Sequence, residues 1–179
     1  MPGKSASKLL YLTYYWQPSG GPGVQRTLKF SKYLSRLRID TFILTVDETR
    51  ASYPLIDETL MEDVPEDLKV IKTNSFEPLE LYRRLNKKKE IPYSGFVNMD
   101  KTSLFQKISR FIRGNFFIPD ARVGWNKYAY REAIKLIATH KLTSVITSSP
   151  PHSTQLVGLK LQSKLHTPWI ADMRDPWTD

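Results

Sequence analysis

Short apolar runs alternate with amphipathic stretches along this chain. Five runs rich in β-branched, aromatic and leucine side chains have the length and composition of buried strands. They cover residues 8–13, 41–46, 68–72, 144–147 and 169–172. Between them, apolar positions recur at the three- and four-residue intervals of a helix with one buried face. These helical stretches cover residues 24–37, 126–140 and 153–165.

The order of these elements predicts the fold class. Strand, helix and strand in succession form a βαβ unit, and such a crossover joins parallel strands. We therefore expect an α/β fold, a Rossmann-like parallel sheet flanked by helices, in a single domain over residues 1–179. The pattern breaks between about residues 74 and 124, where prolines and glycines interrupt it. We interpret that stretch as an insertion with helices of its own.

The last predicted strand is not followed by the helix that would cover it in a doubly wound sheet. The chain stops at Asp179, seven residues after residue 172. We therefore expect the sequence to be the front part of a longer protein.

Composition and charge narrow the classes of function. Lysine and arginine number 27 against 18 acidic residues, a net charge of +9 that favours anionic partners. Nucleic acid, acidic lipid head groups and phosphorylated small molecules all fit, but the cations are dispersed and form no recognised nucleic-acid-binding module. The absence of cysteine excludes a disulfide scaffold, a thiolate zinc site and a cysteine nucleophile. No apolar run is long enough to span a membrane or to form a signal peptide, which predicts a cytoplasmic protein.

Three loops at the carboxyl ends of predicted strands hold polar or glycine-rich residues. They cover positions 14–26, 147–153 and 172–177. Ligands of open parallel sheets bind outside the carboxyl ends of the strands, so the convergence of these loops predicts a binding site.

The first loop contains Gly20, Gly21 and Gly23 directly before a predicted helix that carries Arg26. Bare amides and the helix dipole together suit a phosphate or a carboxylate. A dinucleotide-binding fingerprint is one alternative, with Asp47 on the ribose, although Arg26 stands where the third glycine should be. A purely structural turn is another.

In the second loop, Ser148, Ser149 and His152 surround two prolines. His152 is the one histidine expected at the carboxyl end of a strand, which makes it a candidate for chemistry, although a helix cap or a structural group is an equal reading. The three histidines are scattered and predict no metal site.

The third loop brings Asp172, Arg174 and Asp175 together. Alternating charges of this kind form either a self-neutralising pair or a guanidinium aimed at phosphate or sugar hydroxyls.

Residues 103–117 of the insertion show a basic amphipathic pattern, with Lys107, Arg110 and Arg113 off the apolar face. This pattern fits a helix lying on an anionic membrane surface, and packing against the parent domain produces the same pattern.

Taken in order, these motifs resemble one family. A strand, Gly20-Gly21, a helix with Arg26, Ser148-Ser149-Pro150-Pro151-His152 and then Asp172-Met173-Arg174-Asp175-Pro176-Trp177 resemble the N-terminal half of family 4 glycosyltransferases. These are retaining enzymes of the GT-B arrangement, in which two Rossmann-like domains face each other. Many members carry a histidine at the turn after the last strand seen here, where this chain has Arg174 and Asp175.

The resemblance implies a function for each loop. The chain would be the acceptor-side domain of a metal-independent transferase, and the C-terminal domain that holds most of the nucleotide-sugar donor would be absent. The nucleotide sugar is a co-substrate, so no cofactor is expected. Binding of the donor phosphates would fall to Gly20, Gly21, Gly23 and Arg26, and catalysis to His152, Arg174 and Asp175.

The acceptor implied by the resemblance is a glycan or a lipid-linked sugar in cell-surface polysaccharide synthesis, used at the inner face of the membrane. We expect the fragment alone to be inactive. A non-catalytic module for a phosphorylated ligand is the alternative function, and a nucleic-acid binder is a third.

Overall fold

The computed structural model describes residues 7–77 and 119–174. Five strands form one parallel sheet in the order β3-β2-β1-β4-β5. They are β1 (Lys8–Leu12), β2 (Asp40–Val46), β3 (Lys69–Thr73), β4 (Ser144–Ser148) and β5 (Trp169–Asp172). The helices are α1 (Pro22–Arg36), α4 (Asn126–His140) and α5 (Thr154–Leu165), with two 3₁₀ turns, η1 (Glu58–Asp63) and η2 (Val123–Trp125). The predicted Rossmann-like α/β fold is confirmed, and each strand boundary lies within one residue of the predicted one.

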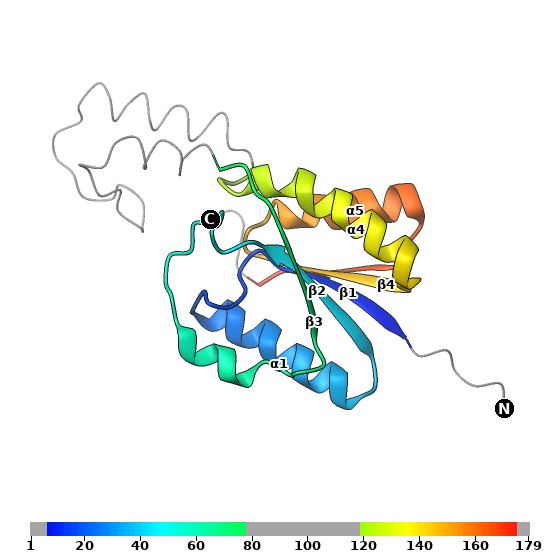
Figure 1. Ribbon diagram of the computed structural model, residues 1–179. Coiled ribbons are helices and arrows are strands. Elements are labelled where there is room, and N and C mark those ends of the chain that lie inside the picture. The colour runs from blue at the N-terminus through cyan, green and yellow to red at the C-terminus, as the bar shows by residue number, and fades with distance from the viewer. Residues whose placement is uncertain (1–6, 78–118, 175–179) are drawn as a thin grey trace, which may run out of the picture.

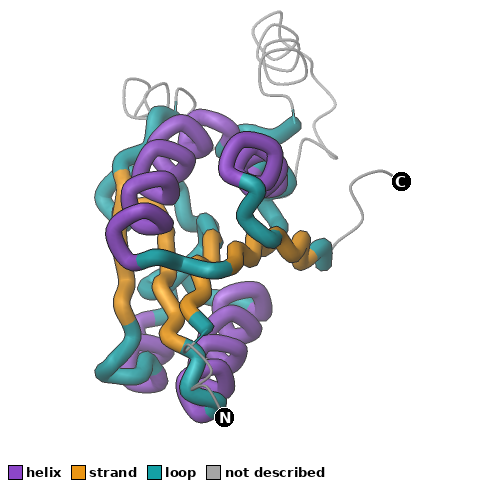
Figure 2. Tube along the Cα trace, turned by 90° about the vertical axis from the view of Figure 1, so that its right-hand side faces the viewer, coloured by secondary structure: helices purple, strands orange, loops and turns teal. Residues whose placement is uncertain are grey.

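The helices cover the sheet from both sides (Figure 1). Helix α1 and the η1 turn pack on one face, and α4 and α5 lie next to each other on the other face. Figure 2, turned by 90°, shows the same three layers, with the α4–α5 pair above the strands and α1 below them. Among the described residues, no helix is long and apolar enough to cross a membrane.

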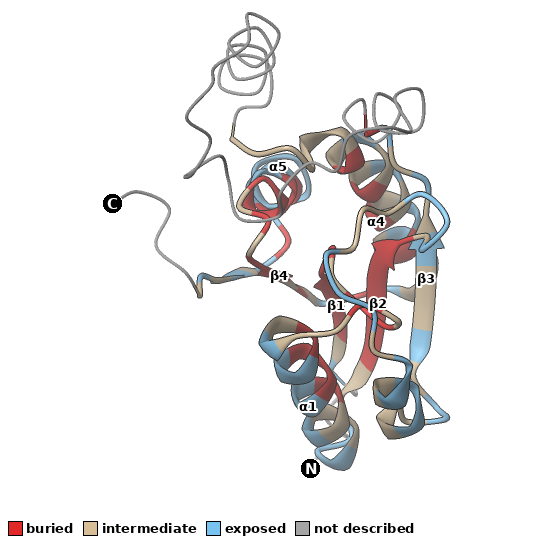
Figure 3. Cartoon of the chain, turned by 90° about the vertical axis from the view of Figure 1, so that its left-hand side faces the viewer, coloured by how far each residue is buried: buried red, intermediate tan, exposed pale blue. Residues whose placement is uncertain are grey.

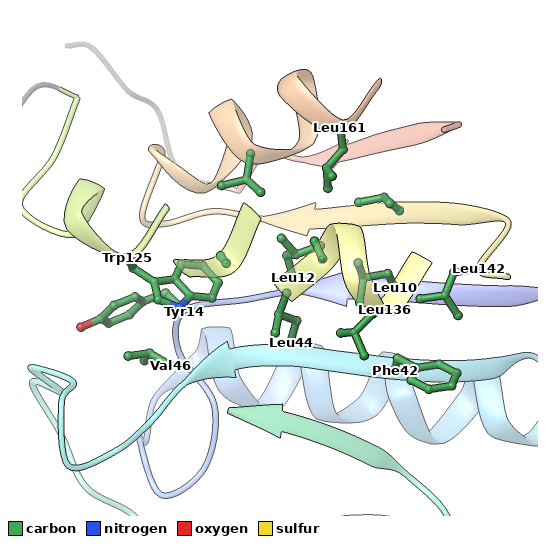
Figure 4. Packing of buried hydrophobic residues seen from close by; sticks show 14 residues of the cluster. Leu10, Leu12, Tyr14, Phe42, Leu44, Val46, Trp125, Leu136, Leu142 and Leu161 are labelled. Atoms are coloured by element: carbon green, nitrogen blue, oxygen red, sulfur yellow. The ribbon is translucent and has the colours of Figure 1, made fainter. Parts of the chain in front are cut away.

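Alternation along the central strands divides the core in two, because successive side chains of a strand point to opposite faces. Leu10 and Leu12 of β1 point toward α4 and α5, where they join Trp125 and Leu161 (Figure 4). Tyr11, between them in sequence, packs with Leu28 of α1 on the opposite face. Burial is deepest in β1 and β2 and falls off toward the β3 edge (Figure 3).

The strand order places the switch point of the sheet between β1 and β4. Helix α1 leaves the end of β1 toward one face, and α5 leaves the end of β4 toward the other. The loops after these two strands therefore diverge, which is the switch point at which open α/β sheets bind ligands.

A buried ionic cluster holds together the two chain segments on either side of residues 78–118. The carboxylate of Glu77 accepts hydrogen bonds from Tyr14, Ser52 and the Arg122 guanidinium, the last at 3.3 Å. Arg122 also donates to the backbone oxygen of Ser52 at 2.8 Å. The backbones touch as well, since a Cβ on Gly124 would collide with the carbonyl oxygen of Phe76. The helices predicted within the insertion, including residues 103–117, lie outside the described residues.

Candidate functional site

The glycine loop after β1 is anchored to a neighbouring segment through Gly20. Its N–H donates to the carbonyl of Leu55 at 2.9 Å, and a Cβ here would lie 2.9 Å from the Cβ of Asp57. Close backbone approach explains the glycine at this position. Because its N–H is already bonded, Gly20 shapes the loop and does not offer that group to a ligand.

Helix α1 begins without an anion of its own. Its N-cap is Gly21 at φ 102°, a conformation that L side chains rarely adopt, and no side chain caps the helix. Pro22 occupies the first turn, which holds no acidic residue. The N–H groups of Val24 and Gln25 donate to the Gly21 carbonyl at 3.2 and 3.3 Å, and proline has no N–H. Among the described residues, the Gly23 N–H and the positive end of the helix dipole are therefore left without a capping group.

Helix α5 offers a comparison within the same molecule. The N–H and hydroxyl of its N-cap residue, Ser153, donate to the carboxylate of Asp120 at 2.6 and 2.9 Å. An internal anion thus occupies the N-terminus of α5, whereas the N-terminus of α1, at the switch point, has none among the described residues.

The first candidate cation, Arg26, has an internal partner. It forms a two-point ion pair with Asp172, with Nη2 and Nε at 2.9 and 3.3 Å from the two carboxylate oxygens. The hydroxyl of Ser148, the register partner of Asp172, also donates to this carboxylate at 3.2 Å. Tyr11 lies beneath the pair, and its burial, followed by the charge of Asp172, raises the pKa of its hydroxyl. Asp172 therefore joins the end of β5 to α1 and β4.

Arg174 lies directly against the uncapped helix. Its Nε donates to the carbonyl of Ser149 at 2.7 Å, which holds the side chain at the switch point. A Cβ on Gly23 would be 2.6 and 2.8 Å from the two terminal nitrogens of the guanidinium. Within the described ranges Arg174 has no carboxylate partner, since Asp172 pairs with Arg26. A guanidinium and a helix N-terminus thus meet at one point, and an anion with several oxygens is the ligand that suits both.

Of the two remaining predicted catalytic residues, the structure describes His152 but not Asp175. His152 is half-buried in the turn after β4, immediately before the α5 N-cap, and its carbonyl accepts from the N–H of Gln155 at 3.1 Å. It shares the turn of Ser149, on which Arg174 rests. Asp175 lies outside the described residues.

Asp47, the candidate for a ribose contact, is engaged locally. One carboxylate oxygen accepts from the N–H and the hydroxyl of Thr49 at 2.8 and 2.6 Å. These bonds, the hydroxyl first, lower the pKa of the carboxyl. The geometry is that of a turn that closes on itself, and it does not favour the dinucleotide reading.

Sequence reasoning missed two parts of this arrangement. Nothing in the sequence pattern predicts that Asp120 caps a helix that begins at Thr154, because the two positions are separated by a whole helix and strand. The contact of Gly23 with Arg174 has no signal in the sequence either, although the pattern predicts that both residues lie in strand-end loops. In the part of the chain that the structure describes, no three His, Asp or Glu side chains gather as metal ligands would.

No protein-family model matches the sequence, and no curated protein matches it. The class of protein is therefore described from the fold and the candidate site alone. The chain is a Rossmann-like α/β domain with a cationic, uncapped helix N-terminus at its switch point.

Proposed function

We propose that this chain is the acceptor-side domain of a retaining GT-B glycosyltransferase. The substrate would be a nucleotide sugar, and the acceptor a glycan or lipid-linked sugar in cell-surface polysaccharide synthesis. One observation carries the proposal: the Arg174 guanidinium lies on the N-terminus of α1, at the switch point, without a carboxylate partner in the described chain. The diphosphate of a nucleotide sugar is an anion of the matching kind.

The chemistry follows from where charge develops. Transfer of a sugar passes through an oxocarbenium-like state while a nucleoside diphosphate departs, so groups that stabilise the departing negative charge supply much of the rate. Arg174 and the Gly23 N–H, at the positive end of the α1 dipole, would bind this leaving group. The ion pair of Arg26 with Asp172 would keep the two loops in register without itself meeting the phosphates.

His152 and Asp175 have a proposed role on the side of the reacting sugar. They belong to the same two loops as Ser149 and Arg174, and their side-chain chemistry suits proton transfer and hydroxyl contacts. We propose catalysis without a metal ion, because the Arg174 guanidinium and the N-terminus of α1 would supply the positive charge that stabilises the departing diphosphate.

The proposed location is the cytoplasmic face of a membrane. Attachment through residues 103–117 stays a prediction from the sequence, because these residues lie outside the described part of the chain. A non-catalytic module for a phosphorylated ligand would use the same contacts with Arg174 and α1, so only a measurement of turnover separates the two functions.

The test uses the full-length protein. Radiolabelled nucleotide sugars are offered with membrane extract as the source of acceptor, and transfer is compared for wild type, Arg174→Ala, His152→Ala and the control Arg36→Ala. Loss of a charge-stabilising donor lowers turnover by about a hundredfold. We expect that loss for Arg174→Ala, a clear loss for His152→Ala, and no change in the control.

The melting temperatures of all variants should agree within the error of the measurement. If the protein binds diphosphate through Arg174 but transfers sugar to no acceptor, the transferase proposal is wrong and the non-catalytic binding module is supported. A fall in stability with unchanged turnover per folded molecule would make both residues structural.

A further inference from the structure

A second cationic site lies on the outer surface, away from the strand-end loops. It is a groove of about 430 Å³ between α4 and α5. Its walls include Asn126, Lys127, Tyr130 and Arg131 from α4 and Leu156 and Lys160 from α5. We call these six residues the α4–α5 groove. Both helices run next to each other on the face opposite α1 (Figure 2).

No carboxylate of the described residues compensates the positive charge of this groove. Within residues 7–77 and 119–174, no carboxylate forms an ion pair with Lys127, Arg131 or Lys160. The ammonium of Lys160 instead lies 4.3 Å from the centre of the Tyr130 ring. Cations outside the groove differ: Lys29 and Lys32 of α1 share a carboxylate, and Lys135, further along α4, pairs with its neighbour Glu132. Charge complementarity therefore calls for an anionic ligand in the groove.

Apolar side chains stand beside the cations. Leu156 and Leu159 of α5 are 43% and 51% exposed, on the outer surface of the same helix that carries Lys160. Lys164, also exposed, lies one turn further along. A soluble phosphate would need the cations alone and would gain nothing from exposed leucines. Leucine and lysine on one outer helix face are the combination found where a helix meets a lipid head-group layer.

We propose that the α4–α5 groove docks this chain on a membrane by binding the phosphate of an anionic phospholipid. Lys127, Arg131 and Lys160 contact the head group, and Leu156 and Leu159 enter the boundary of the acyl chains. The amide of Asn126 donates to the carbonyl of Ser153 at 2.7 Å, so the groove wall is joined to the turn that carries His152. Docking here holds the strand-end loops close to the bilayer. The inference does not depend on the proposed function.

Vesicle co-sedimentation of the 179-residue chain tests this proposal. Two lipid mixtures are used, phosphatidylcholine alone and phosphatidylcholine with about a third of phosphatidylglycerol. The groove variant is Lys127→Gln/Arg131→Gln/Lys160→Gln. The matched control is Lys29→Gln/Lys32→Gln/Arg36→Gln, which removes the same charge from α1 on the opposite face. Urea midpoints of both variants confirm that they fold.

We expect the wild type to bind the anionic vesicles and not the neutral ones. Each basic residue near an anionic leaflet raises partitioning by about fivefold, so the groove variant should bind about a hundredfold more weakly while the control keeps most of its binding. Leu156→Ser/Leu159→Ser should remove the part of the binding that resists high salt.

Three results would overturn the proposal. Equal losses in the groove variant and the control would mean attraction by net charge only. Equal binding to both lipid mixtures would rule out a head-group site. Unchanged binding of the leucine variant, with millimolar inorganic phosphate displacing the wild type from vesicles, would assign the groove to a soluble anion.

Discussion

At Gly23 the absence of a side chain leaves room for a guanidinium. Arg174 comes from the far end of the described chain and uses that room to reach the first turn of α1. Gly21 serves a different purpose, because its φ of 102° is a backbone requirement and a Cβ there would meet open space. Two glycines of one loop are therefore present for separable reasons.

The variant Gly23→Ala should change the anion site without lowering the stability of the fold. The methyl group would sit 2.6 Å from a terminal nitrogen of Arg174, so the guanidinium must move away. Alanine is the better helix former by up to about 1 kcal/mol, so stability should stay level or rise. We expect pyrophosphate affinity to fall by about tenfold, measured by calorimetry, which corresponds to the loss of one charge-assisted hydrogen bond.

Gly21→Ala provides the contrast for this prediction. Its backbone strain should lower the free energy of unfolding by about 1–2 kcal/mol, measured in urea. If Gly23→Ala bound pyrophosphate as well as the wild type, Arg174 would not be part of the anion site.

Glu77 is the residue whose loss should destabilise the fold most directly. Its side chain is only 2% exposed and has Arg122 as its cationic partner. Removing one member of a buried ion pair leaves the other charge buried without a partner, which lowers the free energy of unfolding by about 3–5 kcal/mol. Urea unfolding of Glu77→Ala should show a loss of that size. The exposed pair of Lys29 with Asp63 is the control, and Asp63→Ala should leave the urea midpoint nearly unchanged.

At the scale of elements, two buried tyrosines and one half-buried tyrosine link stability to alkaline pH. Tyr11, Tyr14 and Tyr53 lie on or near the ends of β1 and β2, and burial is the largest cause that raises the pKa of each above the ordinary 10.0. The folded state thus holds these protons more tightly than the unfolded chain. Their contribution is complete below pH 10.0 and is lost as the pH rises above it.

Urea unfolding between about pH 8 and about pH 11 tests this linkage. We expect a level free energy of unfolding up to about pH 10, followed by a fall that is shallower in Tyr53→Phe. The same fall in Tyr53→Phe as in the wild type would show that Tyr53 does not take part.

The ionic cluster of Glu77 and Arg122 has a consequence for residues 78–118. The segments on both sides are held together by this cluster and by the contact of Phe76 with Gly124. The rest of the fold should therefore not need the intervening chain. Replacing residues 78–118 by about six glycine and serine residues should preserve cooperative unfolding, since a shorter loop costs about 1–2 kcal/mol less to close.

Circular dichroism and urea midpoints of the shortened chain check this expectation. Loss of cooperative unfolding would mean that residues 78–118 supply part of the core. The same variant lacks residues 103–117, so its vesicle binding also separates that predicted membrane segment from the α4–α5 groove.

At the scale of the whole molecule, local sequence pattern decided the elements and their order. The strands and helices follow from apolar runs and helical spacing, because each element buries a side of its own residues against the sheet. Helix α4 begins and ends at the predicted residues 126 and 140. The 3₁₀ turn at Glu58–Asp63 was not predicted, since six residues are too few to show a period.

The side-chain partners could not be predicted in the same way. Arg26 and Asp172 are 146 positions apart. The sequence predicts only that the alternating charges of the third loop neutralise one another or leave a guanidinium for a ligand. Partner choice depends on how strand ends come together in the folded sheet. The sequence therefore identified the strand-end loops, while the structure was needed to find which cation of those loops lacks a carboxylate.

Binding of a diphosphate by Arg174 together with the N-terminus of α1 is the property on which the proposed function depends. ³¹P NMR titration of inorganic pyrophosphate with the 179-residue chain tests it most directly, because the method detects weak binding. We predict a saturable shift of the pyrophosphate resonance with the wild type, retained in Lys127→Gln/Arg131→Gln/Lys160→Gln and lost in Arg174→Ala. An equal shift with Arg174→Ala, or loss of the shift in the groove variant instead, would show that Arg174 does not bind the diphosphate.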